Sequence, residues 1–198
     1  AGALNQAERF VRELVDRGTM QVTPDGAASV TVRASQFRRV FRVNVTLDLI
    51  SSAATELWKL TESGLAPNAE RCWSVSLNDL RVIVDILDQP ALFIHYLIRR
   101  LDINALKSVV ARDELDYLMH YVKHGLFFRE GNAPKTDESI MLNGFTEDLD
   151  QYYRKLQGVS NQGSKPRVGV GKRTQTMLSL LQSKLPEHWS SGCIQLLE

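Results

Sequence analysis

The sequence predicts a mixed α/β fold, with a small sheet and flanking helices in the N-terminal half and an all-helical C-terminal half. Short β-prone runs follow an amphipathic opening segment, and apolar residues beyond residue 77 recur with helical spacing. The expected parts are an α/β portion over 1–88, a helical portion packed on it over 89–156, a flexible basic linker over 157–173 and a C-terminal helix over 174–198.

The first elements follow from local signals. Residues 3–17 form an amphipathic pattern that Gly18 ends, so we expect a helix there. Runs at 20–22 and 28–33 flank the turn-forming residues Thr23 to Gly26, which predicts a hairpin. Residues 40–46 are rich in β-branched side chains and predict a further strand, and 52–63 predict a helix.

The second half is predicted from helix caps. A short apolar strand at 72–75 runs into Ser76 and Asp79, which have the spacing of a capping box. Pro90 starts the next expected helix, and Asp113 and Gly125 bracket another. Residues 129–144 are polar and predict a loop, and 146–156 predict a helix.

Composition limits the function only weakly. The net charge is +1, so it makes no global electrostatic case for nucleic acid, and any such case depends on local patches. Cys72 and Cys193 are expected to be two free thiols, which favours a reducing, cytoplasmic location. No apolar run reaches the length of a membrane span, so no membrane partner is expected.

The best metal candidate is a set of three residues on one helix face. Asp116, His120 and His124 recur every four residues, a spacing at which two histidines can chelate zinc. A surface or capping role is the favoured interpretation, and a metal-dependent hydrolase is kept as an alternative. Gly169 to Thr174 lacks the glycine spacing and the hydroxyl position of a phosphate-binding loop, so no cofactor is expected.

Two basic stretches point to nucleic acid. The first comprises Arg33, Arg38, Arg39 and Arg42, and the second comprises Lys165, Arg167, Lys172 and Arg173. No acidic residue interrupts either stretch, and the planar guanidinium group suits phosphate because it can donate to two oxygens. The alternative is that both stretches are ordinary solvated surface.

Metal-dependent nucleases commonly combine clustered carboxylates with a lysine near the attacking water. On a hairpin this chemistry takes the form of an acid followed by Glu-x-Lys, because every second side chain of a strand shares a face. None of the lysines of this chain has Asp or Glu two positions before it. The sequence therefore predicts no catalytic residues of this kind.

The opening helix nevertheless resembles that of restriction-endonuclease-like nucleases, the PD-(D/E)xK superfamily. The residues that carry the resemblance are Gln6 to Phe10, the strand 40–45, Trp73 to Leu80, Phe93 to Leu97 and Gly125 to Phe128. The resemblance implies the C-terminal portion of a larger bacterial protein whose catalytic hairpin lies upstream. It also implies that Gln6 lies near nucleic acid and supports the site without performing chemistry.

The function expected from these observations is that of a non-catalytic, nuclease-like chain that contacts DNA or RNA. The alternative is a protein-interaction or scaffold module, with a protein partner or a second copy of the chain. Its motivation is the aromatic content of the chain, which includes Trp58, Phe93, Tyr96, Phe127 and Phe128.

Overall fold

The structure is a computed structural model that describes residues 2–23, 28–37, 39–47, 55–65, 69–128 and 139–169, together with residues 176 and 180. Its elements in chain order are α1 (Gly2–Arg17), β1 (Thr19–Val22), β2 (Val30–Arg33), η1 (Ala34–Gln36), β3 (Arg42–Thr46), α3 (Leu57–Glu62), η2 (Ala69–Arg71), β4 (Cys72–Ser76), α4 (Leu77–Ile86), α5 (Pro90–Leu106), β5 (Val109–Ala111), α6 (Glu114–His124), β6 (Ile140–Leu142) and α7 (Glu147–Leu156). The mixed α/β prediction is confirmed. None of the described helices has the length and apolar content needed to cross a bilayer.

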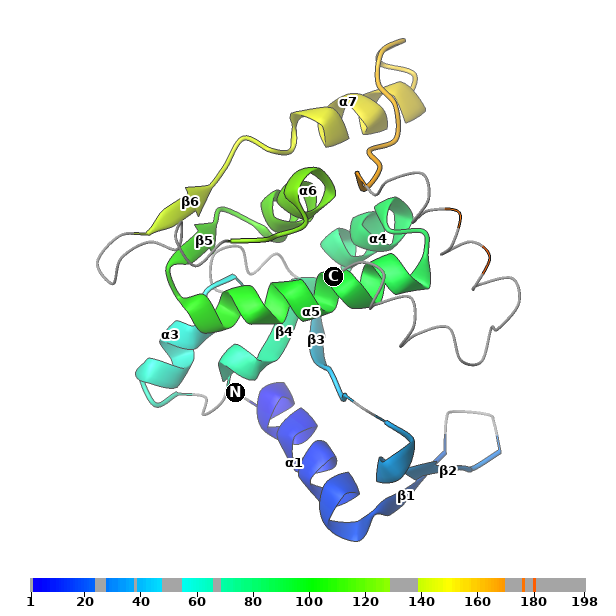
Figure 1. Cartoon of the computed structure of the whole chain (residues 1–198), viewed down its shortest axis with the longest axis vertical. Coiled ribbons are helices and arrows are strands. Elements are labelled where there is room, and N and C mark those ends of the chain that lie inside the picture. The colour runs from blue at the N-terminus through cyan, green and yellow to red at the C-terminus, as the bar shows by residue number, and fades with distance from the viewer. Residues whose placement is uncertain are drawn as a thin grey trace.

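Helix α1 and the hairpin β1–β2 lie together at one end of the molecule (Figure 1). Gly18 joins them with a φ of 71°, a backbone conformation that glycine adopts without steric cost. The strands pair antiparallel from Thr19 opposite Arg33 to Val22 opposite Val30, which confirms the predicted hairpin. The predicted turn lies largely outside the described residues.

Strands β3 and β4 form a parallel pair, in register from Arg42 opposite Cys72 to Thr46 opposite Ser76. All five residues of β4 are buried, whereas every second side chain of β3 is exposed. Asn44 of β3 faces inward and donates from Nδ2 to the Ser74 hydroxyl at 3.1 Å.

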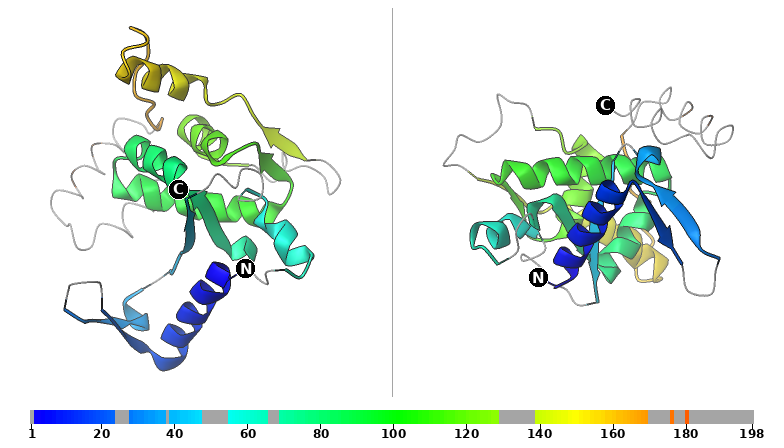
Figure 2. Two further views of the ribbon diagram at one scale, coloured as in Figure 1. Left: turned by 180° about the vertical axis from the view of Figure 1, so that it is seen from behind. Right: turned by 90° about the horizontal axis from the view of Figure 1, so that it is seen from below.

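The core forms where β4, α4, α5 and α6 meet, and α5 crosses the centre of the molecule (Figures 1 and 2). β4 leads directly into α4 because the Ser76 hydroxyl accepts from the Asp79 backbone N–H at 3.0 Å. Pro90 occupies the first turn of α5, where its missing N–H costs nothing. The largest fully buried side chains of the core include Trp73, Tyr96 and Tyr117.

The C-terminal half is not entirely helical, which corrects the sequence prediction. β5 and β6 pair in parallel, from Val109 opposite Ile140 to Ala111 opposite Leu142. β6 lies within the stretch 129–144, which the sequence predicts to be a loop, and 129–138 are outside the described residues. Three-residue strands are too short to show the alternation on which strand prediction depends.

Residues 157–169 contain no helix or strand, yet they contact the folded body. The Gly169 N–H donates to the Val122 carbonyl at 3.3 Å, and Pro166 is buried. Gly163 lies against the backbone of Gln151. The flexibility expected of 157–173 stays a prediction, and residues 170–173 lie outside the described part.

Candidate nucleic-acid interface

The starts of the parallel strands β3 and β4 bring basic residues together. Arg39 precedes β3, Arg42 begins it, and Arg71 directly precedes β4. Because Arg42 lies opposite Cys72 in the register, the residues just before the two strands lie at the same end of the strand pair. Arginines that are about thirty residues apart in the chain thus lie at the same end of the pair.

The C-terminal end of α5 adds a fourth cation at this end of the strand pair. Asn104 donates from Nδ2 to the Cys72 carbonyl at 3.4 Å, which places the last turn of α5 beside the start of β4. Lys107 caps the helix with a φ of 55°. Its Nζ atom lies 2.8 Å from Oε1 of Glu62 on α3, so the lysine also links the two helices.

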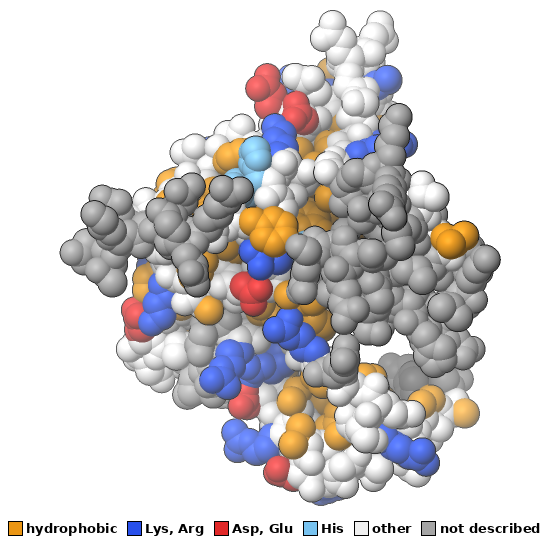
Figure 3. All heavy atoms as spheres, in the orientation of Figure 1, with side chains coloured by type: hydrophobic (Ala, Val, Ile, Leu, Met, Phe, Trp, Pro, Cys, Tyr) orange, Lys and Arg blue, Asp and Glu red, His pale blue; other side chains and the backbone are white. Residues whose placement is uncertain are grey.

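These residues line a cavity of about 590 Å³. Its lining residues are Arg39, Val40, Phe41, Arg42, Trp58, Thr61, Arg71, Leu101, Asp102, Ala105 and Lys107. The lining thus contains four cationic side chains and one carboxylate. Figure 3 shows Lys and Arg side chains gathered in the region between α5 and α1. We call this cavity the basic cavity.

Part of this charge is already compensated. Arg42 forms an ion pair with Glu8 of α1, and Lys107 forms the pair with Glu62. The one carboxylate of the lining, Asp102, lies 3.5 Å from Arg99 Nη1.

Two arginines of the lining have no acidic partner among the described side chains. Arg39 and Arg71 are exposed, and among the described side chains neither has an acidic partner within ion-pair distance. They therefore carry the positive charge that the cavity offers to a ligand.

Two aromatic side chains stand among the cations. The Arg39 guanidinium carbon lies 5.9 Å from the ring centroid of Phe41. Trp58 is half-buried, with Lys59 Nζ at 5.4 Å and Lys107 Nζ at 6.0 Å from its ring. Cations at these distances are attracted to the face of an aromatic ring. The cavity therefore combines positive charge with flat apolar surface.

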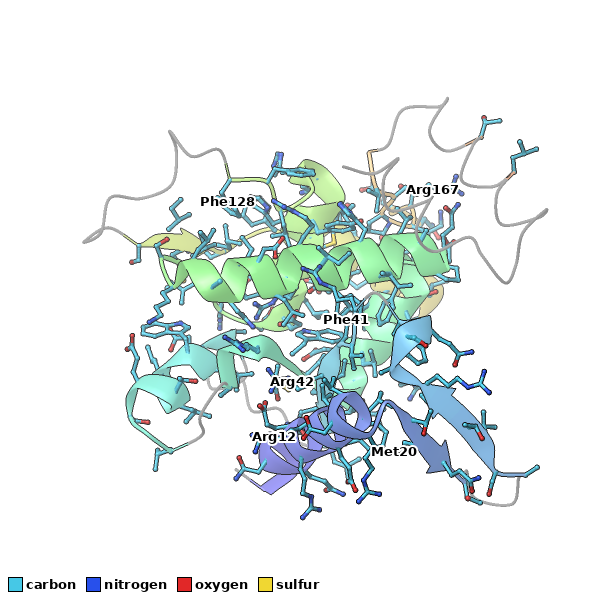
Figure 4. All side chains as sticks on the ribbon, turned by 60° about the horizontal axis from the view of Figure 1, so that its bottom comes forward. Arg12, Met20, Phe41, Arg42, Phe128 and Arg167 are labelled. Atoms are coloured by element: carbon cyan, nitrogen blue, oxygen red, sulfur yellow. The ribbon has the colours of Figure 1, made fainter. Side chains whose placement is uncertain are left out.

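The structure brings together only part of the first predicted cluster. Arg39 and Arg42 line the basic cavity, and Figure 4 shows Phe41 and Arg42 between α1 and α5. Arg33 on β2 and Gln6 on α1 are exposed and are not part of the cavity lining. Arg38 lies outside the described residues.

The second predicted cluster lies elsewhere. Lys165 and Arg167 line a separate cavity of about 1180 Å³ beside α6 and α7, and Lys165 is paired with Asp85 and Asp88 at 3.6 and 3.2 Å. In Figure 4, Arg167 and Arg42 lie on opposite sides of α5. Lys172 and Arg173 are outside the described part of the chain. The described members of the two clusters therefore do not form one continuous surface.

The three metal candidates lie on α6, but no group of three potential ligands that could hold a metal ion occurs within the described residues. His120 is buried rather than on the surface, and its ring stacks on Phe128 with centroids 5.2 Å apart and an interplanar angle of 11°. Burial and the neighbouring His124 lower the pKa of His120 to about 4. Asp116 is also buried, so the surface part of the expected surface or capping role is wrong for both residues. Phe128 and Phe145 lie against the His120 ring.

Sequence reasoning missed Phe41, Trp58, Arg71 and Lys107 as site residues. Phe41 lies between Arg39 and Arg42 of the first basic stretch, whereas Trp58, Arg71 and Lys107 lie outside both basic stretches and have no binding motif near them. For Arg71 the available signal is its position directly before a predicted strand. Using it required the parallel pairing of that strand with β3, which links residues thirty positions apart.

The chain was compared with known families and proteins. No family model matches it, and neither a curated protein nor a solved structure does so.

Proposed function

We propose that this chain binds the phosphate backbone of nucleic acid at the basic cavity and does not cleave it. The observation that carries the proposal is the convergence of Arg39, Arg42, Arg71 and Lys107 on one cavity from three separate segments. Phosphate contacts from Arg and Lys supply most sequence-independent affinity for nucleic acid, because each contact releases condensed counterions. The resemblance of the opening helix to nuclease-like proteins points to the same class of ligand.

The proposed inactivity has a chemical reason. Cleavage assisted by metal ions uses several carboxylates around a cation. The lining of the basic cavity offers Asp102 alone, and that carboxylate lies beside Arg99. The sequence also has no lysine with an acid two positions before it, so it lacks the usual partner of such carboxylates.

The test is a binding titration with a fluorescein-labelled oligonucleotide at low salt, read by anisotropy. We expect the double variant Arg39→Ala/Arg71→Ala to bind about tenfold more weakly or worse, because two phosphate contacts are lost. Arg17→Ala is the matched control, since Arg17 lies on α1, is paired with Glu13 at 2.7 Å and is not part of the cavity lining.

Equal losses in the double variant and in the Arg17→Ala control would place binding outside the cavity. The same mixtures are incubated with Mg²⁺ and run on a denaturing gel. Intact oligonucleotide is the expected result, and cleavage by the unmodified chain would overturn the inactive part of the proposal.

Self-association is a second candidate function, favoured by the outer side of β3. Val43 and Val45 are 39% and 45% exposed there, and the following Leu47 is 81% exposed. Grouped apolar side chains of this kind are typical of interaction surfaces. A second copy of the chain is the proposed occupant. Light scattering should then show that the unmodified chain is a dimer and that Val43→Thr/Val45→Thr is a monomer. An unmodified chain that is monomeric at all concentrations would rule out self-association.

A further inference from the structure

We infer that Trp58 is a stacking surface for an unpaired base, so that the ligand of the basic cavity is single-stranded rather than duplex nucleic acid. This inference rests on the proposed function and extends it to the class of ligand. It is carried by the position of Trp58 in the same lining as Arg39 and Arg71, which have no acidic partner among the described side chains.

The two described tryptophans have different environments. Trp73 is 1% exposed, and its indole N–H donates to Glu114 Oε1 at 2.8 Å inside the core. Trp58 is half-buried and presents part of its surface to the cavity. Trp73 is therefore structural, whereas Trp58 is accessible to a ligand.

The charges around Trp58 match the layout of a nucleotide, in which a flat base is joined to a phosphate. Lys59 and Lys107 place their ammonium groups over the ring, 5.4 and 6.0 Å from its centroid, and Arg71 lines the same cavity. A base that stacks on the indole takes the place of a lysine on the ring face, and Arg71 is available for an adjoining phosphate. Lys59 and Lys107 are already paired with Glu56 and Glu62. Proteins that bind single strands combine such aromatic surfaces with a positively charged groove.

Base stacking excludes this contact inside a duplex. The faces of paired bases are covered by their neighbours in the stack, so a side chain reaches one only after it has been unpaired or flipped out. The cavity volume of about 590 Å³ is in the range of small-ligand pockets. The cavity therefore suits one nucleotide of a single strand. A duplex would contact only the cations at the mouth of the cavity.

The experiment compares a labelled 12-nucleotide strand with the duplex of the same sequence. Binding is measured for the unmodified chain, Trp58→Phe, Trp58→Ala and Arg39→Ala/Arg71→Ala. Circular dichroism verifies that each variant is folded. We expect the strand to bind more tightly than the duplex and Trp58→Ala to weaken strand binding at least about fivefold, with duplex binding unchanged. Trp58→Phe keeps an aromatic face and should recover part of the loss.

Fluorescence gives an independent readout. The strand should quench the tryptophan emission of the unmodified chain, and Trp58→Phe should abolish most of that quenching. Full quenching in Trp58→Phe would overturn the inference.

The variants separate the two proposals. If Trp58→Ala binds the strand normally while the double arginine variant does not, stacking is wrong and backbone binding stands. Equal weakening of strand and duplex by Trp58→Ala also overturns the selection of unpaired bases. If neither variant weakens binding, both proposals are wrong.

Discussion

Arg100 and Glu114 form an ion pair that protein encloses completely. Arg100 Nε lies 3.0 and 3.1 Å from the two carboxylate oxygens of Glu114, and the side chains are 0% and 2% exposed. Glu114 also accepts from the Trp73 indole and the Tyr96 hydroxyl. One carboxylate on α6 thus ties together β4 and α5, the two elements whose ends carry Arg71 and Lys107.

Loss of the Glu114 charge should destabilise the fold strongly. Glu114→Gln leaves the Arg100 guanidinium buried without its counter-charge, and breaking one side of a buried pair costs about 3–5 kcal/mol. Urea unfolding followed by circular dichroism measures the change. The control is Asp148→Asn, since Asp148 pairs with Lys123 on the surface at 2.7 Å and such pairs contribute about 1 kcal/mol or less. Comparable stability of the two variants would contradict this assignment.

Stability should fall as the pH is lowered below neutrality, in part because of His120. Burial lowers its pKa in the folded chain from 6.5 to about 4. Between these values the unfolded chain binds a proton that the folded chain does not, so acid favours unfolding. His120→Phe keeps a ring against Phe128 and removes the titration.

The free energy of unfolding of His120→Phe, relative to the unmodified chain, should therefore rise steadily from pH 6.5 to 4. Denaturant titrations at four pH values measure this difference. Burial also lowers the pKa of His95 to about 4. His95 is present in both proteins, so its contribution cancels in the difference between their free energies of unfolding. A difference that does not vary with pH would contradict the prediction.

Gly163→Ala should release the segment 157–169 from the folded body. A Cβ atom at Gly163 would lie 2.5 Å from the Gln151 carbonyl oxygen, and its φ of 120° disfavours any other residue. Gly169→Ala is the matched control, because a Cβ there meets nothing within 4 Å. Hydrogen exchange should show faster exchange across 157–169 in Gly163→Ala alone. Equal exchange in both variants would mean that the close approach does not hold the segment.

The start of α6 should depend on its cap. Asp113 accepts from the Asp116 backbone N–H at 3.1 Å, and removal of such a cap costs about 1 kcal/mol. Asp113→Ala should therefore lower the melting temperature by about 2–4 °C, whereas Asp113→Asn, which retains an acceptor, should lower it less. Equal melting temperatures of the two variants would argue that the cap contributes nothing.

Elements with strong local signals could be predicted from the sequence. The helix over 3–17, the hairpin and the caps at Ser76 and Asp113 each depend on residues within a few positions of one another, and the structure contains all of them. Glu114 shows the limit of such signals. It directly follows a cap and has the sequence of an exposed first-turn acid, yet long-range packing of Trp73 and Tyr96 buries it.

Features that depend on long-range pairing could not be predicted. β5 and β6 are three residues each and lie about thirty residues apart, so neither shows a strand pattern by itself. The basic cavity is of the same kind. Arg39 and Arg42 are visible as part of a basic stretch, but Trp58, Arg71 and Lys107 join them only through the parallel pairing of β3 with β4 and the return of α5.

The salt dependence of binding tests the central claim most directly. The affinity of the chain for a single-stranded oligonucleotide is measured from about 50 to 200 mM salt, and the logarithm of the affinity is plotted against that of the salt concentration. We predict a negative slope that becomes shallower by about 1.4 in Arg39→Ala/Arg71→Ala, since each lost phosphate contact removes about 0.7. The same slope in the variant as in the unmodified chain, or no salt-dependent binding at all, would contradict a phosphate-binding role for the cavity.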